Sequence, residues 1–432
     1  AQVPFRARPP LVPTSLAAYA GLPGEVTGPR IATAGLRPTW GKGPHPLQPQ
    51  APLPERVDVA IIGGGIMGLA LAWNLAGRRA GRILVLERGY LCEGASGRNG
   101  GGVRAQWTTP TLIELAKESI EFMGRFAQEL GINVWLRKGG YLFLAHDQET
   151  LRRIEYGADL QKRYGLPTRV IGPGEAGEIV PQLDTSKFIA ASWNPEDGVV
   201  FPWPFLWGYA DGARKRGALV EPFTRASGIE VSDGRVRAVQ TDRGRVAADR
   251  VVIAAGAWSP TVARLAGVEL PNVPYRHEIV SSEPLKPFLG PLVSMLGTGL
   301  YFSQSMRGEI VGGMGDPTEP PGLNQASSLR FMARYSRALS ELVPQVAAVK
   351  LLRQWAGCYD VTPDHSPVLG ETPGVAGLLQ MSGFVGHGFM MAPAVGRRMA
   401  EWMGGSKDEI FERYNLRRFA EGRLIQETFI IG

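Results

Sequence analysis

Residues 57–79 read VDVAIIGGGIMGLALAWNLAGRR, an apolar run that passes through three glycines into a second apolar run. The first run is rich in β-branched residues, as in a buried parallel strand, and the second has helical spacing. Gly63, Gly65 and Gly68 stand at G-x-G-x-x-G spacing. The first permits a tight turn, the second lets the backbone approach a pyrophosphate, and the third lets the helix pack on the strand. This stretch predicts a dinucleotide site at a helix N-terminus.

An acidic residue follows at the spacing that such a site needs. A second predicted strand, residues 83–86, ends in Glu87, nineteen residues after Gly68. A carboxylate there can accept hydrogen bonds from the ribose of adenosine. The glycine spacing alone is a weak signal, because a glycine-rich turn can also contain it. The strand, the helix and the acidic residue in register favour dinucleotide binding.

Three further motifs lie along the chain. Residues 93–104 read EGASGRNGGGVR, where a nicotinamide enzyme would continue into its next helix. Such a glycine loop suits a second, long approach of backbone to ligand. Residues 251–258 read VVIAAGAW, an apolar strand that ends in small residues. The third motif has two parts, WAGCYDVTPDHSPVLG at residues 355–370 and GFVGHGFMMAPAVG at residues 383–396.

In these four motifs and their order, the chain resembles the D-amino-acid-oxidase superfamily of FAD enzymes. Within it, the chain is similar to sarcosine oxidase β-subunits and dye-linked proline dehydrogenases, over roughly residues 57–402. The resemblance implies an α/β fold, with a Rossmann-like FAD-binding domain interleaved with an α+β substrate domain on an antiparallel sheet. It also implies oxidation of the C–N bond of a secondary amine or amino acid. A hydride would pass to flavin N5, and the resulting imine would be hydrolysed.

The chain of 432 residues exceeds a single-core domain, so we expect two interleaved domains. We predict an FAD-binding domain from residues 57–138, 198–268 and 356–404, a substrate domain from residues 139–197 and 269–355, an N-terminal extension over residues 1–56 and a tail over residues 405–432. Periodicity predicts helices over residues 108–130, 148–164, 205–216 and 328–342, and strands over residues 141–144, 275–281, 299–303 and 309–313.

The N-terminal extension differs in composition from the rest of the chain. It holds 12 of the 34 prolines and no sustained period, which predicts an extended, partly polyproline II arm along the surface of this protein or of a partner. Six basic and two acidic residues give it +4 of the formal net charge of +7. Because this charge lies in an arm without interleaved aromatic residues, we expect no nucleic-acid partner. A nucleic-acid-modifying flavoprotein remains an alternative.

The cysteines and the hydropathy of the sequence are used to predict the cellular compartment of the protein. Cys92 and Cys358 form neither a disulfide framework nor a metal-ligand pattern, which suits a reducing compartment. The short apolar run at residues 16–22 lies between prolines, and no segment of eighteen apolar residues occurs. We therefore expect a cytoplasmic protein with no signal peptide, no membrane span and no metal site.

The resemblance places a set of residues against the FAD, most of them in the glycine motifs. They are Gly63, Gly65, Ile66, Met67, Gly68, Glu87, Arg88, Ser96, Arg98, Asn99, Gly100, Gly101, Gly102, Ala226, Ala255, Gly256, Trp258, Gly383, Gly386, His387, Gly388, Phe389 and Met390. A helix from about residue 392 to residue 403 would point its N-terminus at the flavin edge where negative charge develops. His387 is either a flavin contact or a structural histidine that holds its loop.

On the substrate side, we predict catalytic roles for Arg104, Tyr359 and His387. Arg104 matches an arginine that binds the substrate carboxylate in relatives, and its bidentate geometry suits that task. One alternative for Arg104 is a surface ion pair. Another is that Arg104 supports the flavin or the fold, and the carboxylate site would then be sought among Arg276, His277 and His387. Tyr359 matches a substrate-facing tyrosine of the monomeric sarcosine oxidases. No separate base is needed if the amine is already neutral.

Departures from the family pattern refine these expectations. Gly357, not Cys358, stands where some relatives attach flavin, so we predict non-covalent FAD. Trp203 lies near the position of an FMN-linking histidine, which argues against a covalent FMN. Met390 replaces a lysine that assists carboxylate binding, and Ile310 replaces a lysine that promotes reaction with oxygen. We therefore favour a dehydrogenase over an oxidase.

The expected partners are a small amino acid or amine and an electron acceptor, either oxygen or a protein or quinone. Additional subunits or a homo-oligomer are also expected. Sarcosine, proline, another N-methyl or cyclic amino acid, and an opine all fit the substrate pattern. A subunit whose FAD serves mainly docking or electron relay in a complex remains the alternative from another class.

Overall fold

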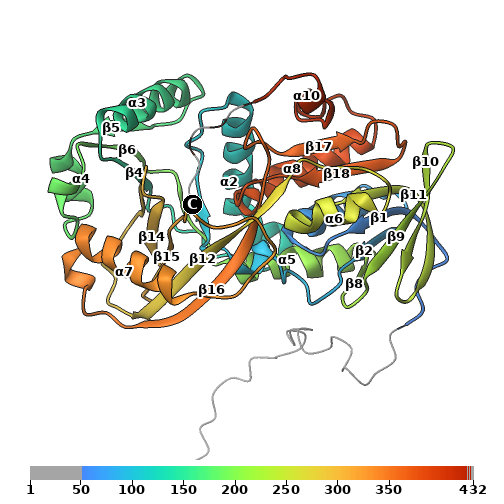
Figure 1. Ribbon diagram of the computed structural model, residues 1–432, viewed down its shortest axis with the longest axis horizontal. Coiled ribbons are helices and arrows are strands. Elements are labelled where there is room, and N and C mark those ends of the chain that lie inside the picture. The colour runs from blue at the N-terminus through green and yellow to red at the C-terminus, as the bar shows by residue number, and fades with distance from the viewer. Residues whose placement is uncertain (1–50, 426, 428, 430–432) are drawn as a thin grey trace, which may run out of the picture. The chain divides into compact units, whose positions relative to one another are not determined.

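The computed structural model describes residues 51–425, 427 and 429 (Figure 1). The chain divides into two units between Ala51 and Pro52, and the fold described below belongs to the second unit. The predicted proline-rich arm falls almost wholly on residues 1–50 and lies outside the described residues.

The first sheet is built around the G-x-G-x-x-G stretch. Its strand order is β17 (Val368–Glu371), β18 (Leu378–Ser382), β11 (Gly244–Ile253), β1 (Arg56–Ile62), β2 (Ile83–Leu86) and β8 (Leu219–Glu221). The strands from β18 to β8 are parallel, and β17 is antiparallel to β18. The hairpin strands β9 (Ala226–Ser232) and β10 (Arg235–Thr241) extend it from β11. The predicted Rossmann-like sheet is confirmed.

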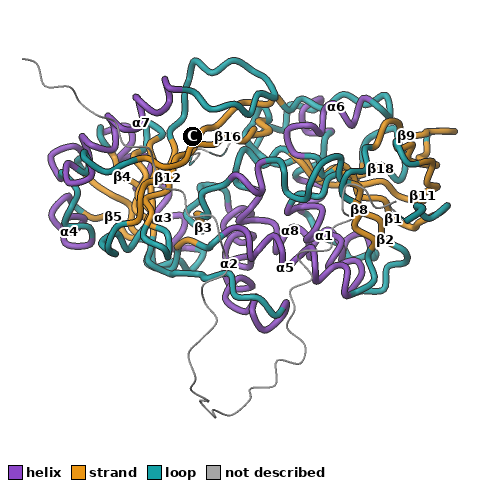
Figure 2. The backbone as a smooth tube through the Cα atoms, turned by 90° about the horizontal axis from the view of Figure 1, so that it is seen from below, coloured by secondary structure: helices purple, strands orange, loops and turns teal. Residues whose placement is uncertain are grey.

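Helices cover both faces of this sheet. Figure 2 shows α1 (Ile66–Gly77), α5 (Pro202–Lys215) and α8 (Gly388–Met403) together on one side, and α6 (Ser259–Arg264) on the other. The amphipathic helix α2 (Pro110–Leu130) packs on α8 and buries Leu112, Leu115 and Phe126, as its helical period predicts. The apolar side chains of these helices form the largest core cluster.

The second sheet is mixed. Its order is β16 (Leu351–Val361), β12 (Val273–Pro284), β15 (Glu309–Gly313), β14 (Leu300–Gln304), β13 (Leu292–Met295), β4 (Tyr141–Ala145), β6 (Ala190–Asn194) and β5 (Arg169–Ile171). Neighbouring strands are antiparallel except for β13 and β4, which are parallel. Figure 1 shows α3 (Gln148–Arg163), α4 (Pro173–Ile179) and α7 (Leu329–Leu342) beside this sheet.

The chain passes between the two sheets several times. Strands β1 and β2 belong to the first, β4 to β6 to the second, β8 to β11 to the first, β12 to β16 to the second, and β17 and β18 to the first. The short strands β3 (Gly102–Val103) and β7 (Gly198–Val199) pair with each other at two of the crossings. The predicted domain limit between residues 355 and 356 falls inside β16, a strand of the second sheet.

Helix α8 begins earlier than the sequence suggests. We expected it from about residue 392, with Pro393 near its start, but it begins at Gly388 and contains Pro393. Proline removes one main-chain donor and disturbs the helix locally. Ser119 of α2 compensates, because its Oγ accepts from the Ala394 N–H at 3.2 Å and donates to the Met391 carbonyl at 3.4 Å. A tertiary contact thus lets the helix run through the proline.

Candidate active site

The larger cavity, of about 280 Å³, opens at the carboxyl ends of the parallel strands. Fifteen of the residues predicted to contact the cofactor line it: Gly63, Gly65, Ile66, Met67, Glu87, Arg88, Ser96, Asn99, Ala226, Ala255, Gly256, Trp258, Gly386, Gly388 and Phe389. We refer to it as the first cavity. Its place at the strand ends is where open α/β sheets bind ligands.

The glycines of the first motif act as the spacing predicts. Gly63 has a φ of +122°, and a Cβ there would lie 2.3 Å from the carbonyl oxygen of Ala254 at the end of β11. A Cβ on Gly68 would lie 2.1 Å from the Gly63 carbonyl oxygen. Gly68 lines neither this cavity nor the smaller one beside it, and the close contact indicates that its task is to let α1 pack against the turn. The turn and the helix start are therefore fixed by the absence of side chains.

Two helices begin at the first cavity. Ile66 and Met67 begin α1, and Gly388 and Phe389 begin α8. Neither helix has a side-chain hydrogen bond at its N-cap residue. The Ile66 N–H donates to the Ser96 Oγ at 3.0 Å, so at α1 the positive helix end acts beside a hydroxyl. The positive end of a helix favours anions, so the cavity suits a ligand with negative charge at two separate places. A flavin dinucleotide, with its pyrophosphate and its electron-accepting ring, meets this requirement.

Glu87 lies in the wall of the first cavity and also ties its loops together. Its two carboxylate oxygens accept main-chain hydrogen bonds at 2.9 Å, one from Gly64 and one from Gly89. Burial raises the pKa of Glu87, although both hydrogen bonds and the neighbouring Arg88 act to lower it. The Arg88 guanidinium carbon lies 4.3 Å from the ring centre of Trp258, across the same cavity. Both predicted residues therefore shape this wall.

A smaller cavity, of about 80 Å³, adjoins the first. We call it the second cavity. Ala95, Asn99, Gly386 and Phe389 line both cavities. Further predicted residues line the second cavity, namely Arg98, Gly100, Gly101, Gly102, Tyr359, His387 and Met390. The glycine loop thus continues from one cavity to the other.

Aromatic side chains form much of the second cavity. The ring of His277 stacks on Tyr359 at 4.7 Å and on Tyr301 at 5.6 Å between ring centres. The His277 Nε2 lies 3.1 Å from the Tyr301 hydroxyl. Burial lowers the pKa of His277 to about 4, so the imidazole is neutral at pH 7. With Tyr141 on a further side, these rings make a nonionic wall.

Arg104 lies behind this wall and lines neither cavity. Its guanidinium is fully buried, 3.7 Å from the ring centre of Trp107, and donates to the main-chain carbonyls of Gln106 and Phe429. One nitrogen, Nη2, lies 3.4 Å from Nε2 of His387, which does line the second cavity. Burial and the Arg104 charge hold the pKa of His387 well below its usual range.

The alternative reading of Arg104 as a surface ion pair is wrong. Arg104 is buried, and no described carboxylate lies within 4.0 Å of its guanidinium. Its Nε has no hydrogen-bond partner in the described part of the chain, and burial lowers its pKa. The carboxylates of Glu427 and Asp197 act on this charge from a greater distance without pairing with it. A buried cation that lacks a direct partner can still accept an anion.

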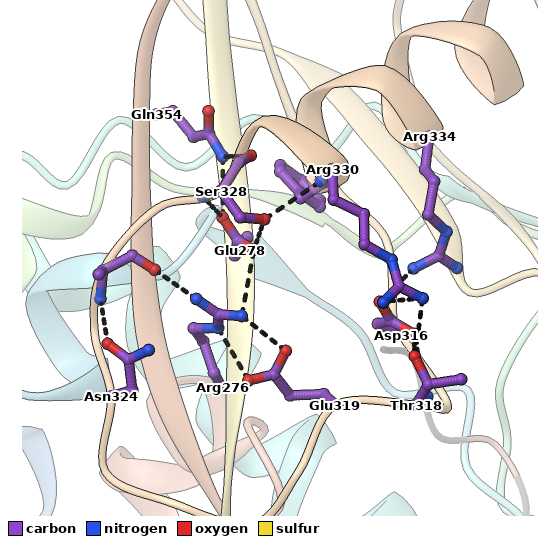
Figure 3. Close-up of polar contacts among 12 residues, drawn as sticks. Arg276, Glu278, Asp316, Thr318, Glu319, Asn324, Ser328, Arg330, Arg334 and Gln354 are labelled. Carbon is purple, nitrogen blue, oxygen red and sulfur yellow. Dashed lines mark hydrogen bonds and ion pairs between the residues drawn. The ribbon is translucent and has the colours of Figure 1, made fainter.

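Arg276 does not serve the second cavity. It precedes His277 on β12, but strand alternation turns it to the other face. Figure 3 shows it in a polar cluster, where it bonds Glu319 through Nε at 2.9 Å and Nη2 at 2.8 Å and donates to the Ala326 carbonyl at 2.9 Å. Its charge is thus used to hold the segment before α7.

Residues 58–402 match the family model DAO, described as FAD dependent oxidoreductase. The chain belongs to the DAO family. The β subunit of sarcosine oxidase from Rhodobacter capsulatus is 31% identical over 390 residues, 88% of this chain and 92% of the relative. The β subunit from Rhizobium meliloti is 30% identical, over 92% of this chain and 96% of the relative. The crystal structure of L-proline dehydrogenase from P. horikoshii has a TM-score of 0.82 and 34% identity, over 86% and 100% of the two chains.

Membership of the DAO family confirms the predicted family, fold class and FAD-dependent oxidoreductase activity. The first cavity fits FAD, because its close glycine turns suit a pyrophosphate and because two helices begin at it with their positive ends. No helix in residues 51–425 is both long and apolar enough to span a membrane.

The positions that depart from the family pattern lie in different places. Met390 lines the second cavity and Gly357 also faces it, whereas Cys358 faces the first. Ile310 packs into the core of the second sheet and lines neither cavity. Its neighbour Val311 points to the glycine loop instead, because successive residues of a strand face opposite sides.

Several cavity residues of this DAO-family protein were not predicted. In the first cavity they include Thr224, Arg225, Ser227, Thr261, Val262, Leu265, Cys358 and Asp360. In the second cavity they are Ala95, Tyr141, Ile279, Leu292, Tyr301 and Gly357, whereas His277 was named only as an alternative carboxylate site. One available signal was the position of residues 224–227 just beyond a parallel strand. Most of the others come from α6 or from strands whose neighbours are distant in sequence.

Proposed function

We propose that this enzyme oxidises the C–N bond of a small secondary amine or N-substituted amino acid. FAD, bound in the first cavity, would accept a hydride at N5, and the imine product would be hydrolysed. The observation that carries the proposal is the small aromatic second cavity, which adjoins the FAD cavity and has the buried Arg104 cation behind it. The relatives named for sarcosine and proline oxidation support this substrate class.

Arg104 is proposed to bind the substrate carboxylate from the His387 end of the second cavity. Its Nη2 donates to the main-chain carbonyl of Phe429. A carboxylate is a stronger acceptor than an amide carbonyl, because the hydrogen bond is then charge-assisted. The incoming carboxylate would therefore compete for this donor. Met390 cannot share the charge, and Arg98, the described cation in the lining of the second cavity, already donates to the main-chain carbonyls of Glu93 and Ala356. The task is therefore assigned to Arg104.

The second cavity would bind the amine in its neutral form. Burial disfavours charged groups, and its wall holds no described carboxylate that would stabilise an ammonium. A neutral amine has the lone pair that assists hydride loss from the adjacent carbon, so no catalytic base is required. Burial also raises the pKa of Tyr359, which keeps its hydroxyl protonated as a hydrogen-bond donor.

A dehydrogenase that passes electrons to a protein or quinone is the favoured form. No lysine is found among the described residues of the second cavity, and neither Ile310 nor Val311 supplies one. Sarcosine oxidase β subunits are named as parts of a larger enzyme, so additional subunits are proposed here too. The cytoplasmic location remains a prediction.

Anaerobic mixing with a panel of amines tests the proposal. Sarcosine, L-proline, N-methyl and cyclic amino acids and opines would each be added to the holoenzyme, and the loss of oxidised-flavin absorbance followed. At least one should reduce the flavin rapidly. If none does, while dithionite reduces it fully, the protein is an FAD-containing docking or relay subunit instead.

Acid precipitation tests the proposed non-covalent FAD. Cys358 faces the first cavity, but burial raises the pKa of its thiol, and only the thiolate is a good nucleophile. All flavin should therefore appear in the acid supernatant, for wild type and for Cys358→Ser alike. A yellow pellet from wild type that disappears in Cys358→Ser would show a covalent bond.

A further inference from the structure

Strand β16 separates the two cavities. Gly357 and Tyr359 face the second cavity, while Cys358 and Asp360 face the first, as strand alternation requires. The hydride must cross from one cavity to the other, so the reacting end of the cofactor belongs at this boundary. Asp360 is buried, at 6% exposure, and lies on the FAD side of it.

The Asp360 carboxylate holds the loop that leads into α8. Its Oδ2 accepts a hydrogen bond of 2.5 Å from the Gly383 N–H, and the N–H groups of Phe384 and Val385 also donate to it. Consecutive N–H groups that converge on one carboxylate make an anion-binding nest. The carboxylate thus organises the start of the GFVGHG motif.

This loop is strained. Val385 has a φ of +48°, in the left-handed region that β-branched residues rarely adopt, and the flanking Gly383 and Gly386 have φ values of +78° and +80°. Such strain persists only where the surroundings fix it. Asp360 does so from one side. On the other side Tyr359 packs so closely that a Cβ on Gly386 would lie 2.4 Å from its ring.

The charge of Asp360 has no cationic partner within 4.0 Å among the described residues. Burial raises its pKa to about 6, against the main-chain hydrogen bonds, so it is ionised at pH 7. The titratable and charged groups on the elements around it are Cys358 and Tyr359 on β16, Arg276 and His277 on β12, Glu93 and Arg98 in the glycine loop, and His387 at the start of α8. Arg276 pairs with Cys358 and so lies on the same face of the sheet as Asp360, but its guanidinium is bound by Glu319.

We propose that Asp360 is a positioning residue that holds the strained Gly383–Gly386 loop and the α8 N-terminus at the FAD, and that its negative charge lowers the FAD reduction potential. The proposal rests on the proposed function in one respect, because hydride transfer between the two cavities places the flavin ring at their boundary, and it does not depend on the identity of the substrate. Reduction adds electron density to the flavin, and a buried anion nearby opposes it. The positive end of α8 acts in the opposite sense. Asp360 and α8 would together set the potential.

Asp360→Asn tests the electrostatic part. The reduction potential of the holoenzyme, measured by equilibration with a reference dye at pH 7.5, should be more positive than in wild type. Asp364→Asn is the matched control, since Asp364 is equally buried four residues later but pairs with Arg418 and lines neither cavity. Equal potentials in Asp360→Asn and Asp364→Asn would overturn the proposal.

The pH dependence sharpens this test. As the pH falls through the pKa of Asp360, protonation removes the negative charge, so the wild-type potential should rise more steeply than that of Asp360→Asn. The two potentials should converge near pH 5 and differ most above pH 7. A constant difference across this range would contradict a role for the ionised carboxylate.

Val385→Gly separates the positioning role from the charge. Glycine adopts the positive φ without strain, so the loop no longer depends on Asp360. Asp360→Asn should weaken FAD binding by roughly 10-fold, and Val385→Gly should restore most of that loss while leaving the change in potential intact. If Asp360→Asn alone retains no FAD, the double variant is compared with Val385→Gly. No rescue of affinity would refute the positioning role, and no difference in potential would refute the electrostatic one.

Discussion

The turns that shape the first cavity come from short glycine motifs, whereas the aromatic rings of the second cavity come from four separate strands. Two glycine motifs and two helix N-termini form the first, and a single added methyl group would fill its critical turns. The second takes its walls from rings on β4, β12, β14 and β16, which come together only in the folded sheet. The cofactor site is therefore encoded by local spacing, and the substrate site by sheet topology.

The strongest test of this difference replaces a glycine. In Gly68→Ala the new Cβ would lie 2.1 Å from the Gly63 carbonyl oxygen, so α1 must shift away from the turn. We expect the purified variant to retain no FAD, as measured by its absorbance after dialysis. Gly124→Ala in α2 is the control, because a Cβ there meets nothing within 4 Å. It should be stabilised by roughly 0.5–1 kcal/mol and keep its full flavin content.

Retention of FAD by Gly68→Ala would contradict the proposal that the close main-chain contact at this turn is required for FAD binding. It would mean that the loop can yield and that side chains, rather than the close contact of backbone, hold the dinucleotide.

Arg104→Met tests the proposed carboxylate site behind the second cavity without altering the first cavity. A sheltered charge-assisted pair contributes on the order of 2–4 kcal/mol, so kcat/KM for an amino-acid substrate should fall by roughly 30- to 1,000-fold. FAD content should not change, since Arg104 lines neither cavity. The measurement is steady-state kinetics with the best amino acid of the panel.

The control for Arg104→Met is the decarboxylated analogue of the same substrate. It has no carboxylate to lose, so its kcat/KM should change little. Equal losses on both substrates would show that Arg104 supports the fold, through its bonds to Gln106 and Phe429, and does not bind substrate.

The same difference explains which parts of the molecule could be read from the sequence. The turn at Gly63, the strand β2 and the acidic Glu87 were predicted with correct bounds, because their signals lie within thirty residues. The start of α8 was misplaced, because the bond that accommodates Pro393 comes from Ser119 on another helix. The spacing of residues within α8 cannot predict a hydrogen-bond partner on another helix.

The second cavity shows the limit more clearly. Tyr359 was placed by its motif, but His277 and Tyr301, which stack beside it, carry no motif and were not predicted as its lining. Ile310 lies in the core of the second sheet while its neighbour Val311 faces the glycine loop, because a shift of one position along a strand turns a side chain to the other face. The register of the strands, which decides which side chains face the second cavity, was known only from the structure.

Glu87→Ala measures how far a side chain contributes to the first cavity. Loss of charge-assisted ribose hydrogen bonds should cost roughly 1.5–3 kcal/mol, or about a 10- to 150-fold rise in the FAD Kd. Asp58→Ala is the control, since Asp58 likewise accepts a main-chain bond, from Arg82 at 2.6 Å, but lies outside the cavity. If Glu87→Ala binds FAD as tightly as Asp58→Ala, the predicted ribose contact is wrong.

Tyr301→Phe should have the smallest effect of these variants. It tests whether a side-chain bond in the second cavity also affects FAD binding in the first. It removes the hydroxyl that lies 3.1 Å from His277 Nε2, so the free energy of unfolding should fall by about 0.5–1.5 kcal/mol in urea titrations of the holoenzyme. Tyr335→Phe is the control, because the Tyr335 hydroxyl is buried in the same region without a partner among the described residues, and its removal should cost nothing. The FAD Kd should be unchanged in both variants. Equal stability losses would mean that the His277–Tyr301 bond contributes nothing, and a weakened FAD Kd in Tyr301→Phe would mean that the two cavities are not built independently.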